Sequence, residues 1–154
     1  MTTITASEVN KLRQMTGAGM MDCKNSLVEA EGNFDKAVEI IRKKGMAVAN
    51  KRADRDATEG CVLAGVSSDA KFGAVVVLNC ETDFVAKNEN FVKLTRSFLD
   101  IALENKPANL DALKALELDG RKISEHVVEQ TGVIGEKLDL SYFELVEAEE
   151  VTAY

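Results

Sequence analysis

The sequence has no tryptophan, one proline, one histidine, six phenylalanines and two tyrosines in 154 residues. A hydrophobic core must therefore be mostly aliphatic. The hydrophobic content of 45% is typical of a globular protein and argues against disorder. No window approaches 18 consecutive apolar residues, so we expect no membrane span. The N-terminus lacks a basic stretch followed by an apolar run, so we also expect no secretory signal.

The cysteines Cys23, Cys61 and Cys80 stand at unrelated spacings. An odd number at such spacings fits free thiols in a reducing compartment better than a disulfide framework. We therefore expect a cytoplasmic protein.

Charge is spread unevenly around a net value of −7. Residues 1–57 hold ten Lys and Arg against eight Asp and Glu, whereas residues 58–154 hold nine against eighteen. The acidic bulk argues against direct nucleic-acid binding, which normally needs a basic face. The asymmetry favours two structural units with different roles.

The first 45 residues predict a bundle of three short helices. Thr5 and Glu8 have the spacing of a capping box, so a first helix should begin after Thr5. This helix should end at Gly17. A second helix is expected over residues 21–30.

A third helix should begin after Asn33 and close at Gly45. The residues that follow predict a charged helical linker with a solvated face. These boundaries divide the chain into a three-helix domain at residues 1–45, the linker at 46–58 and an α+β core subdomain at 59–154. We expect the core subdomain to be truncated at its C-terminus.

After the linker the hydrophobic period changes to two, which is typical of strands. Strands are expected over residues 61–66 and 72–80, joined as a hairpin, and a third strand around residues 138–142. The pattern shifts at Tyr142 and Phe143, which predicts a bulge there.

Helical spacing returns between the second and third strands. A long amphipathic helix should begin near Asn88 and end by Pro107, and shorter helices are expected over residues 110–116 and 123–130. The predicted fold class is therefore α+β. A three-helix bundle is followed by a three-stranded antiparallel sheet packed with helices.

The junction between the second strand and the long helix holds an acid, Asp83, beside a large aromatic residue, Phe84. Strand-to-helix connections are usually exposed, and exposed loops on rigid scaffolds carry binding residues. The pair could insert an apolar wedge into a partner and place a charge beside it. The alternative is that Phe84 folds back into the core and Asp83 helps to cap the helix.

The sequence offers little for catalysis. It has no Gly-rich phosphate loop and no calcium-loop pattern. Its single histidine, His126, is expected to face solvent from a helix. Glu81 and Asp83 would share a face only if the strand continued through them. We expect no cofactor, no metal ligands and no enzyme activity, and therefore a binding protein.

Two long motifs stand out in the sequence. One covers residues 79–88, Asn-Cys-Glu-Thr-Asp-Phe-Val-Ala-Lys-Asn. The other covers residues 12–24, Leu-Arg-Gln-Met-Thr-Gly-Ala-Gly-Met-Met-Asp-Cys-Lys. Both motifs resemble those of the bacterial translation elongation factor Ts family and lie at the separation that the family shows. The resemblance extends from Thr5 to Tyr154. The family continues further, so we expect this chain to be an N-terminal fragment.

The resemblance implies a guanine-nucleotide exchange factor that promotes GDP release from the GTPase elongation factor Tu. Thr82, Asp83, Phe84 and Val85 would form the wedge. Phe84 would enter a gap between partner helices, and Asp83 would disturb the surroundings of the partner's Mg²⁺.

The resemblance also implies a second contact, on the N-terminal bundle, which resembles a ubiquitin-associated-type domain. Arg13, Met20 and Met21 would dock on the GTPase domain. For each methionine, packing within the bundle is the alternative. Ile134 and Gly135, before the third strand, match another segment near the interface.

Two other functions stay open at this point. The chain could be a plain interaction module without exchange activity, in which the bundle binds another protein. It could also be a small thiol or carboxylate enzyme that uses Cys23 or Cys80. Self-association of the chain stays open as well.

Overall fold

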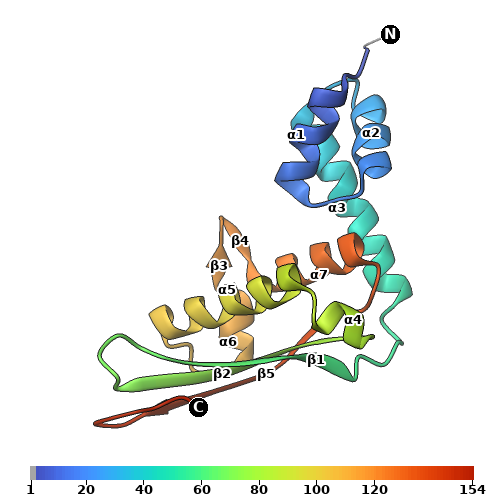
Figure 1. Cartoon of the computed structure of the whole chain (residues 1–154). Helices are drawn as coiled ribbons and strands as arrows, with labels where there is room; N and C mark the ends of the chain where they lie inside the picture. The colour runs from blue at the N-terminus through green and yellow to red at the C-terminus, as the bar shows by residue number, and fades with distance from the viewer. Residues whose placement is uncertain (1–2) are drawn as a thin grey trace. The chain divides into compact units, whose positions relative to one another are not determined.

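The computed structural model describes residues 3–154, which form two compact units (Figure 1). The first unit comprises the chain up to Ala53 together with Val128–Gly135, and the second comprises Asp54–Val127 together with Glu136–Tyr154. Helix α7, Ile123–Ile134, therefore contributes residues to both units. No helix within the described range is long and apolar enough to cross a membrane.

The first unit contains three helices near the N-terminus: α1 (Ala6–Thr16), α2 (Met20–Glu29) and α3 (Phe34–Lys51). The predicted start and end of α1 are confirmed. Thr5 and Glu8 form a capping box, and Gly17 ends the helix with a φ of 72°. Glycine suits that left-handed conformation because it has no Cβ.

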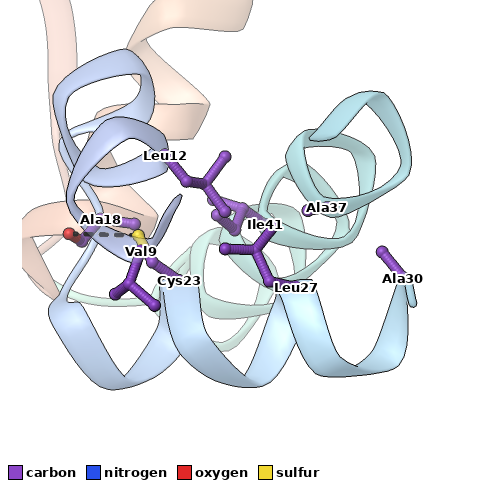
Figure 2. Close-up of a cluster of buried hydrophobic side chains, with 8 residues drawn as sticks. All are labelled: Val9, Leu12, Ala18, Cys23, Leu27, Ala30, Ala37 and Ile41. Atoms are coloured by element: carbon purple, nitrogen blue, oxygen red, sulfur yellow. Dashed lines mark hydrogen bonds between the residues drawn. The ribbon is translucent and has the colours of Figure 1, made fainter. Parts of the chain in front are cut away.

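The core of this bundle is mostly aliphatic. Figure 2 shows its buried side chains, which are Val9, Leu12, Ala18, Cys23, Leu27, Ala30, Ala37 and Ile41. The Cys23 thiol adds a weak hydrogen bond to the carbonyl oxygen of Ala18, with a sulfur-to-oxygen distance of 3.7 Å. Each fully buried aliphatic side chain contributes about 1.5–3 kcal/mol, so this cluster is the main source of stability in the bundle.

The predicted end of the third helix at Gly45 is wrong, because α3 continues to Lys51. Gly45 faces the part of α7 that belongs to the same unit. A Cβ added to Gly45 would lie 3.7 Å from the Cα of Gly132, and a Cβ added to Gly132 would overlap the Gly45 backbone. The two glycines thus allow close approach of two backbones, and Gly45 is a packing residue rather than a helix terminator.

The second unit is α+β, as predicted, with an antiparallel sheet in the order β1–β2–β5 (Figure 1). The strands are β1 (Glu59–Val66), β2 (Phe72–Cys80) and β5 (Asp139–Glu147). Helix α5 (Glu89–Asn105) packs against β1 and β2. Two short helices complete the unit's helical content outside α7: α4 (Asp83–Ala86) and α6 (Leu110–Ala115).

The sheet bulge lies close to its expected place but not at it. Leu78 pairs with Leu140 while Val77 pairs with Tyr142, so the extra residue is Ser141. The predicted position at Tyr142 and Phe143 is therefore wrong. Side chains alternate between faces along a regular strand, so the bulge is what allows Leu140 and Phe143, three residues apart, both to be buried.

A small hairpin of β3 (Glu117–Leu118) and β4 (Arg121–Lys122) has no predicted counterpart. Its two-residue turn, Asp119 and Gly120, has φ values of 53° and 79°, and an Asp-Gly pair is the usual sequence signal for such a turn. The prediction that His126 faces solvent is wrong. The residue is buried, and its Nε2 donates a hydrogen bond to the carbonyl oxygen of Leu118.

Leu27→Ala should destabilise the bundle by about 2–5 kcal/mol, because it leaves a cavity in a fully buried cluster. Its neighbour Val28 is 57% exposed and provides the matched control. Val28→Ala should change stability by less than about 0.5 kcal/mol. Denaturant unfolding followed through the amide signals of α1–α3 measures both values. Equal effects of the two substitutions would contradict this description of the core.

Candidate functional site

Residues 81–88 connect β2 to α5, and most of this connection folds as a helical turn rather than an irregular loop. Thr82 caps α4, with its hydroxyl oxygen 3.4 Å from the amide nitrogen of Val85. Asn88 caps α5 with its own side chain, which confirms the predicted start of the long helix. The connection is therefore ordered by one cap at each of its two helices.

Phe84 projects from the first turn of α4 and is 84% exposed. None of the α4 residues is buried. The alternative in which Phe84 returns to the core is therefore wrong. A phenyl ring left in water forgoes about 1.5–3 kcal/mol that burial against a partner would supply.

Asp83 precedes Phe84 and carries the charge of the turn. The ammonium nitrogen of Lys87 lies 3.1 Å from Asp83 Oδ2, one helical turn further on. Its hydrogen bond and its positive charge hold the pKa of Asp83 below the ordinary value. Asp83 is consequently an exposed, ionised carboxylate at neutral pH, next to an exposed aromatic ring.

Glu136 holds the start of this turn, and sequence reasoning missed it. Its Oε1 accepts hydrogen bonds from the amides of Glu81 and Thr82, at 3.1 and 3.0 Å, and its Oε2 accepts one from the Thr82 hydroxyl at 2.7 Å. Glu81 in turn accepts from the amide of Lys137 at 2.7 Å. The partners lie 54 to 56 residues apart, so no local pattern reveals these contacts.

Cys80 ends β2 beside the turn. Its thiol donates to the carbonyl oxygen of Thr82, with a sulfur-to-oxygen distance of 3.2 Å. Burial, followed by the negative charge of Glu136, raises the pKa of Cys80 to about 11. The thiol is therefore protonated at neutral pH and is a weak nucleophile. Residues 3–154 also contain no group of three or more His, Cys, Asp or Glu arranged to hold a metal ion.

In the first unit, three predicted contact residues lie around the connection between α1 and α2. Arg13 is exposed in the last turn of α1, and Met20 and Met21 begin α2 with exposures of 58% and 63%. The alternative for both methionines, packing within the bundle, is therefore wrong. Met15 is 57% exposed and was missed, although flexible methionine side chains suit partner surfaces.

Ile134 and Gly135 lie at the end of α7 and are half-buried. Gly135 has a φ of 79° and ends the helix. The next residue is Glu136, whose carboxylate holds the α4 cap. The structure thus groups Thr82–Val85 in one turn, and the chain leads from Ile134 and Gly135 directly into the residue that contacts this turn.

Known proteins that resemble this chain are elongation factors Ts. The family model described as "Elongation factor TS" matches residues 81–154. The chain is 53% identical, over 98% of its length, to the elongation factor Ts of Azobacteroides pseudotrichonymphae. It is 54% identical over its full length to that of Christiangramia forsetii.

The chain belongs to the elongation factor Ts family. It spans about half the length of the curated elongation factors Ts it matches: 54% of the Azobacteroides protein and 56% of the Christiangramia protein. A third relative, from Bacteroides thetaiotaomicron, is 53% identical over 98% of the chain, which covers 45% of that protein. The part matched by the elongation factor Ts model contains both α4 and Glu136.

Lys87→Met should raise the pKa of Asp83 towards its ordinary value, because the two main effects that lower it both come from the Lys87 ammonium. An NMR titration of the Asp83 side-chain carboxyl measures the change. Lys43→Met removes a similar exposed pair with Glu39 and should leave Asp83 unaffected. If Lys87→Met left the pKa of Asp83 where it is, the pair would not be the cause of its lowering.

Cys61 should react with a thiol reagent before Cys23 and Cys80 in the native chain. Cys61 is partly exposed, whereas Cys23 and Cys80 are buried. The pKa of Cys80 is also raised to about 11, so its thiol is protonated at the pH of labelling. Mass spectrometry of the chain labelled with iodoacetamide at about pH 8 identifies the order, since the thiolate is the reacting form. Fast labelling of Cys80 would contradict the structure and revive the thiol-enzyme hypothesis.

Proposed function

We propose that this chain promotes GDP release from the GTPase elongation factor Tu, as a guanine-nucleotide exchange factor of translation. The observation that supports this function best is Phe84, which is 84% exposed beside a charged Asp83 on a capped turn. An exposed ring contributes no burial free energy to the fold. Burial of the ring in a matching gap of a partner would contribute that free energy to binding.

The proposed wedge is Thr82, Asp83, Phe84 and Val85. Phe84 enters a gap between helices of the GTPase, and its burial yields about 1.5–3 kcal/mol, which offsets a modest displacement of those helices. Asp83 then acts on the groups that surround the partner's Mg²⁺. Because that ion holds the nucleotide phosphates, weakening its site lowers the affinity for GDP.

The thermodynamics of this mechanism are reciprocal. If the factor weakens GDP binding by a given ratio, GDP weakens binding of the factor by the same ratio. The factor therefore works by stabilising a nucleotide-free state. No bond is made or broken on the factor, so we propose a binding protein rather than an enzyme, with no cofactor of its own.

We further propose that the N-terminal bundle and the α+β core subdomain both contact the partner. Residues 1–45 dock on the GTPase domain through Arg13, Met20 and Met21, and residues 59–154 carry the wedge. Residues 46–58 link the two parts, and Ile134 and Gly135 add a further contact. Since bacterial translation takes place in the cytoplasm, we propose the cytoplasm as the location.

A second candidate function is a protein-interaction module without exchange activity. The exposure of Met15, Met20 and Met21 favours it, because flexible methionines suit partner surfaces. The two functions differ in which substitutions matter. A module would lose partner binding on substitution of Met20 or Met21 and would be indifferent to Phe84, whereas an exchange factor would need Phe84 for GDP release.

Phe84→Ala should reduce stimulation of GDP release by about tenfold or more, because the lost burial of 1.5–3 kcal/mol exceeds the roughly 1.4 kcal/mol that corresponds to tenfold. The fold should be unaffected, since the ring is exposed. Release of fluorescent GDP from elongation factor Tu at increasing chain concentration measures the effect. Val62→Ala, at a residue 62% exposed in β1, is the control and should act like the unsubstituted chain. Undiminished release with a folded Phe84→Ala chain would rule out the wedge.

A further inference from the structure

Glu136 makes three hydrogen bonds to the segment that carries Phe84. We propose that Glu136 is a positioning residue, which holds the cap of α4 and thereby sets the direction in which Phe84 projects. The inference rests on the proposed function for its consequence, but its structural part can be tested separately. Glu136 lies outside the motifs that identify the family in the sequence, and its own side chain is half-buried.

The two carboxylate oxygens of Glu136 divide their work. Oε1 accepts from two successive backbone amides, those of Glu81 and Thr82, and Oε2 accepts from the Thr82 hydroxyl. Hydrogen bonds to a charged acceptor are stronger than those between neutral groups. One side chain thus fixes both the backbone and the side chain of the residue that begins α4.

The Thr82 hydroxyl transmits this constraint to the helix. A hydroxyl has one proton, and here it is donated to Glu136 Oε2 at 2.7 Å. The oxygen's lone pairs are then free to accept from the amide of Val85, which is the capping bond of α4. Glu136 therefore selects the hydroxyl orientation in which Thr82 can cap.

α4 depends on hydrogen bonds from outside the helix because its own length and burial stabilise it little. It is four residues long, and none of its residues is buried. Isolated helices shorter than about 12 residues are marginal in water. The Lys87 pair adds little, because it is exposed and exposed ion pairs contribute weakly. The three hydrogen bonds that Glu136 accepts from Glu81 and Thr82 therefore support the beginning of this helix.

The segment that supplies Glu136 is itself fixed. Gly135 ends α7 in the left-handed conformation, with a φ of 79°, which a side chain would strain. On the other side, the amide of Lys137 donates to Glu81 Oε1 at 2.7 Å. Glu136 thus accepts hydrogen bonds from residues 81 and 82, and Glu81 accepts one from residue 137. Each of the two segments supplies a carboxylate acceptor to the other.

The test compares Glu136→Ala with Glu136→Gln in the full 154-residue chain. Alanine removes both acceptor oxygens and with them all three hydrogen bonds. Glutamine keeps one oxygen for the amides of Glu81 and Thr82 and places an amide group near the Thr82 hydroxyl. Glu144→Ala, at an exposed acid in β5, is the control for loss of a negative charge. Circular dichroism establishes that each variant is folded.

The first readout is amide hydrogen exchange, which needs no partner. Glu136→Ala should lower the protection of the Thr82 and Val85 amides by about tenfold or more, while amides in the middle of β2 keep theirs. Glu136→Gln should lower the protection of the same two amides by about threefold or less. Unchanged protection of both amides in Glu136→Ala would overturn the inference, whatever the GDP measurements show.

The second readout is stimulation of GDP release, measured in a double-mutant cycle with Phe84→Ala. Glu136→Ala alone should reduce stimulation by about tenfold. In the Phe84→Ala background, Glu136→Ala should reduce stimulation by less than about a further twofold. The reason is that a residue that acts only by positioning the Phe84 ring has no effect once that ring is absent. Equal, additive losses in both backgrounds would overturn the positioning role.

The two proposals fail in distinguishable ways. If the unsubstituted chain does not accelerate GDP release, the proposed function fails. Loss of Thr82 and Val85 protection in Glu136→Ala would still establish that Glu136 holds the turn. Should Glu136→Ala prove unfolded, Thr82→Val replaces the hydroxyl with a methyl group of similar size and should lower the protection of the Val85 amide. Thr82→Ser keeps a hydroxyl and should restore that protection. Full Val85 protection in Thr82→Val would overturn the inference.

Discussion

The buried contact between β2 and α5 is the constraint on which the site depends. β2 is the central strand and turns Val76 and Leu78 inward, and α5 buries Phe91 and Phe98. Residues 81–88 run from the end of this strand to the start of this helix. Because both anchors are fixed by apolar burial, the short connection has few conformations open to it.

Order in the α4 turn comes from hydrogen bonds rather than from burial. Glu136 and Thr82 hold the beginning of the helix, and no residue of α4 is buried. The fold therefore separates two requirements that usually conflict. The sheet and α5 supply stability, while Phe84 stays exposed and is not part of the hydrophobic core.

Much of the fold follows from local patterns, and what does not follow involves distant contacts. The capping residue Thr5 and the helix-ending Gly17 act on neighbours in the chain, so their roles are readable in the sequence. Gly45 looks like a helix end until α7 is seen to pack against it. His126 is buried under a hairpin that is not predicted. At the site, the motif predicts the exposed wedge, but Glu136 acts across more than fifty residues and carries no local signature.

The pair between Asp83 and Lys87 bears on how easily the Asp83 carboxylate can change its neighbours. In the free chain the Asp83 carboxylate already has a cationic neighbour, 3.1 Å away and in solvent. Because exposed ion pairs contribute little to stability, separating Asp83 from Lys87 costs little free energy. The carboxylate is therefore available to other groups that approach the turn, and Lys87 remains one helical turn away to pair with it again when they leave.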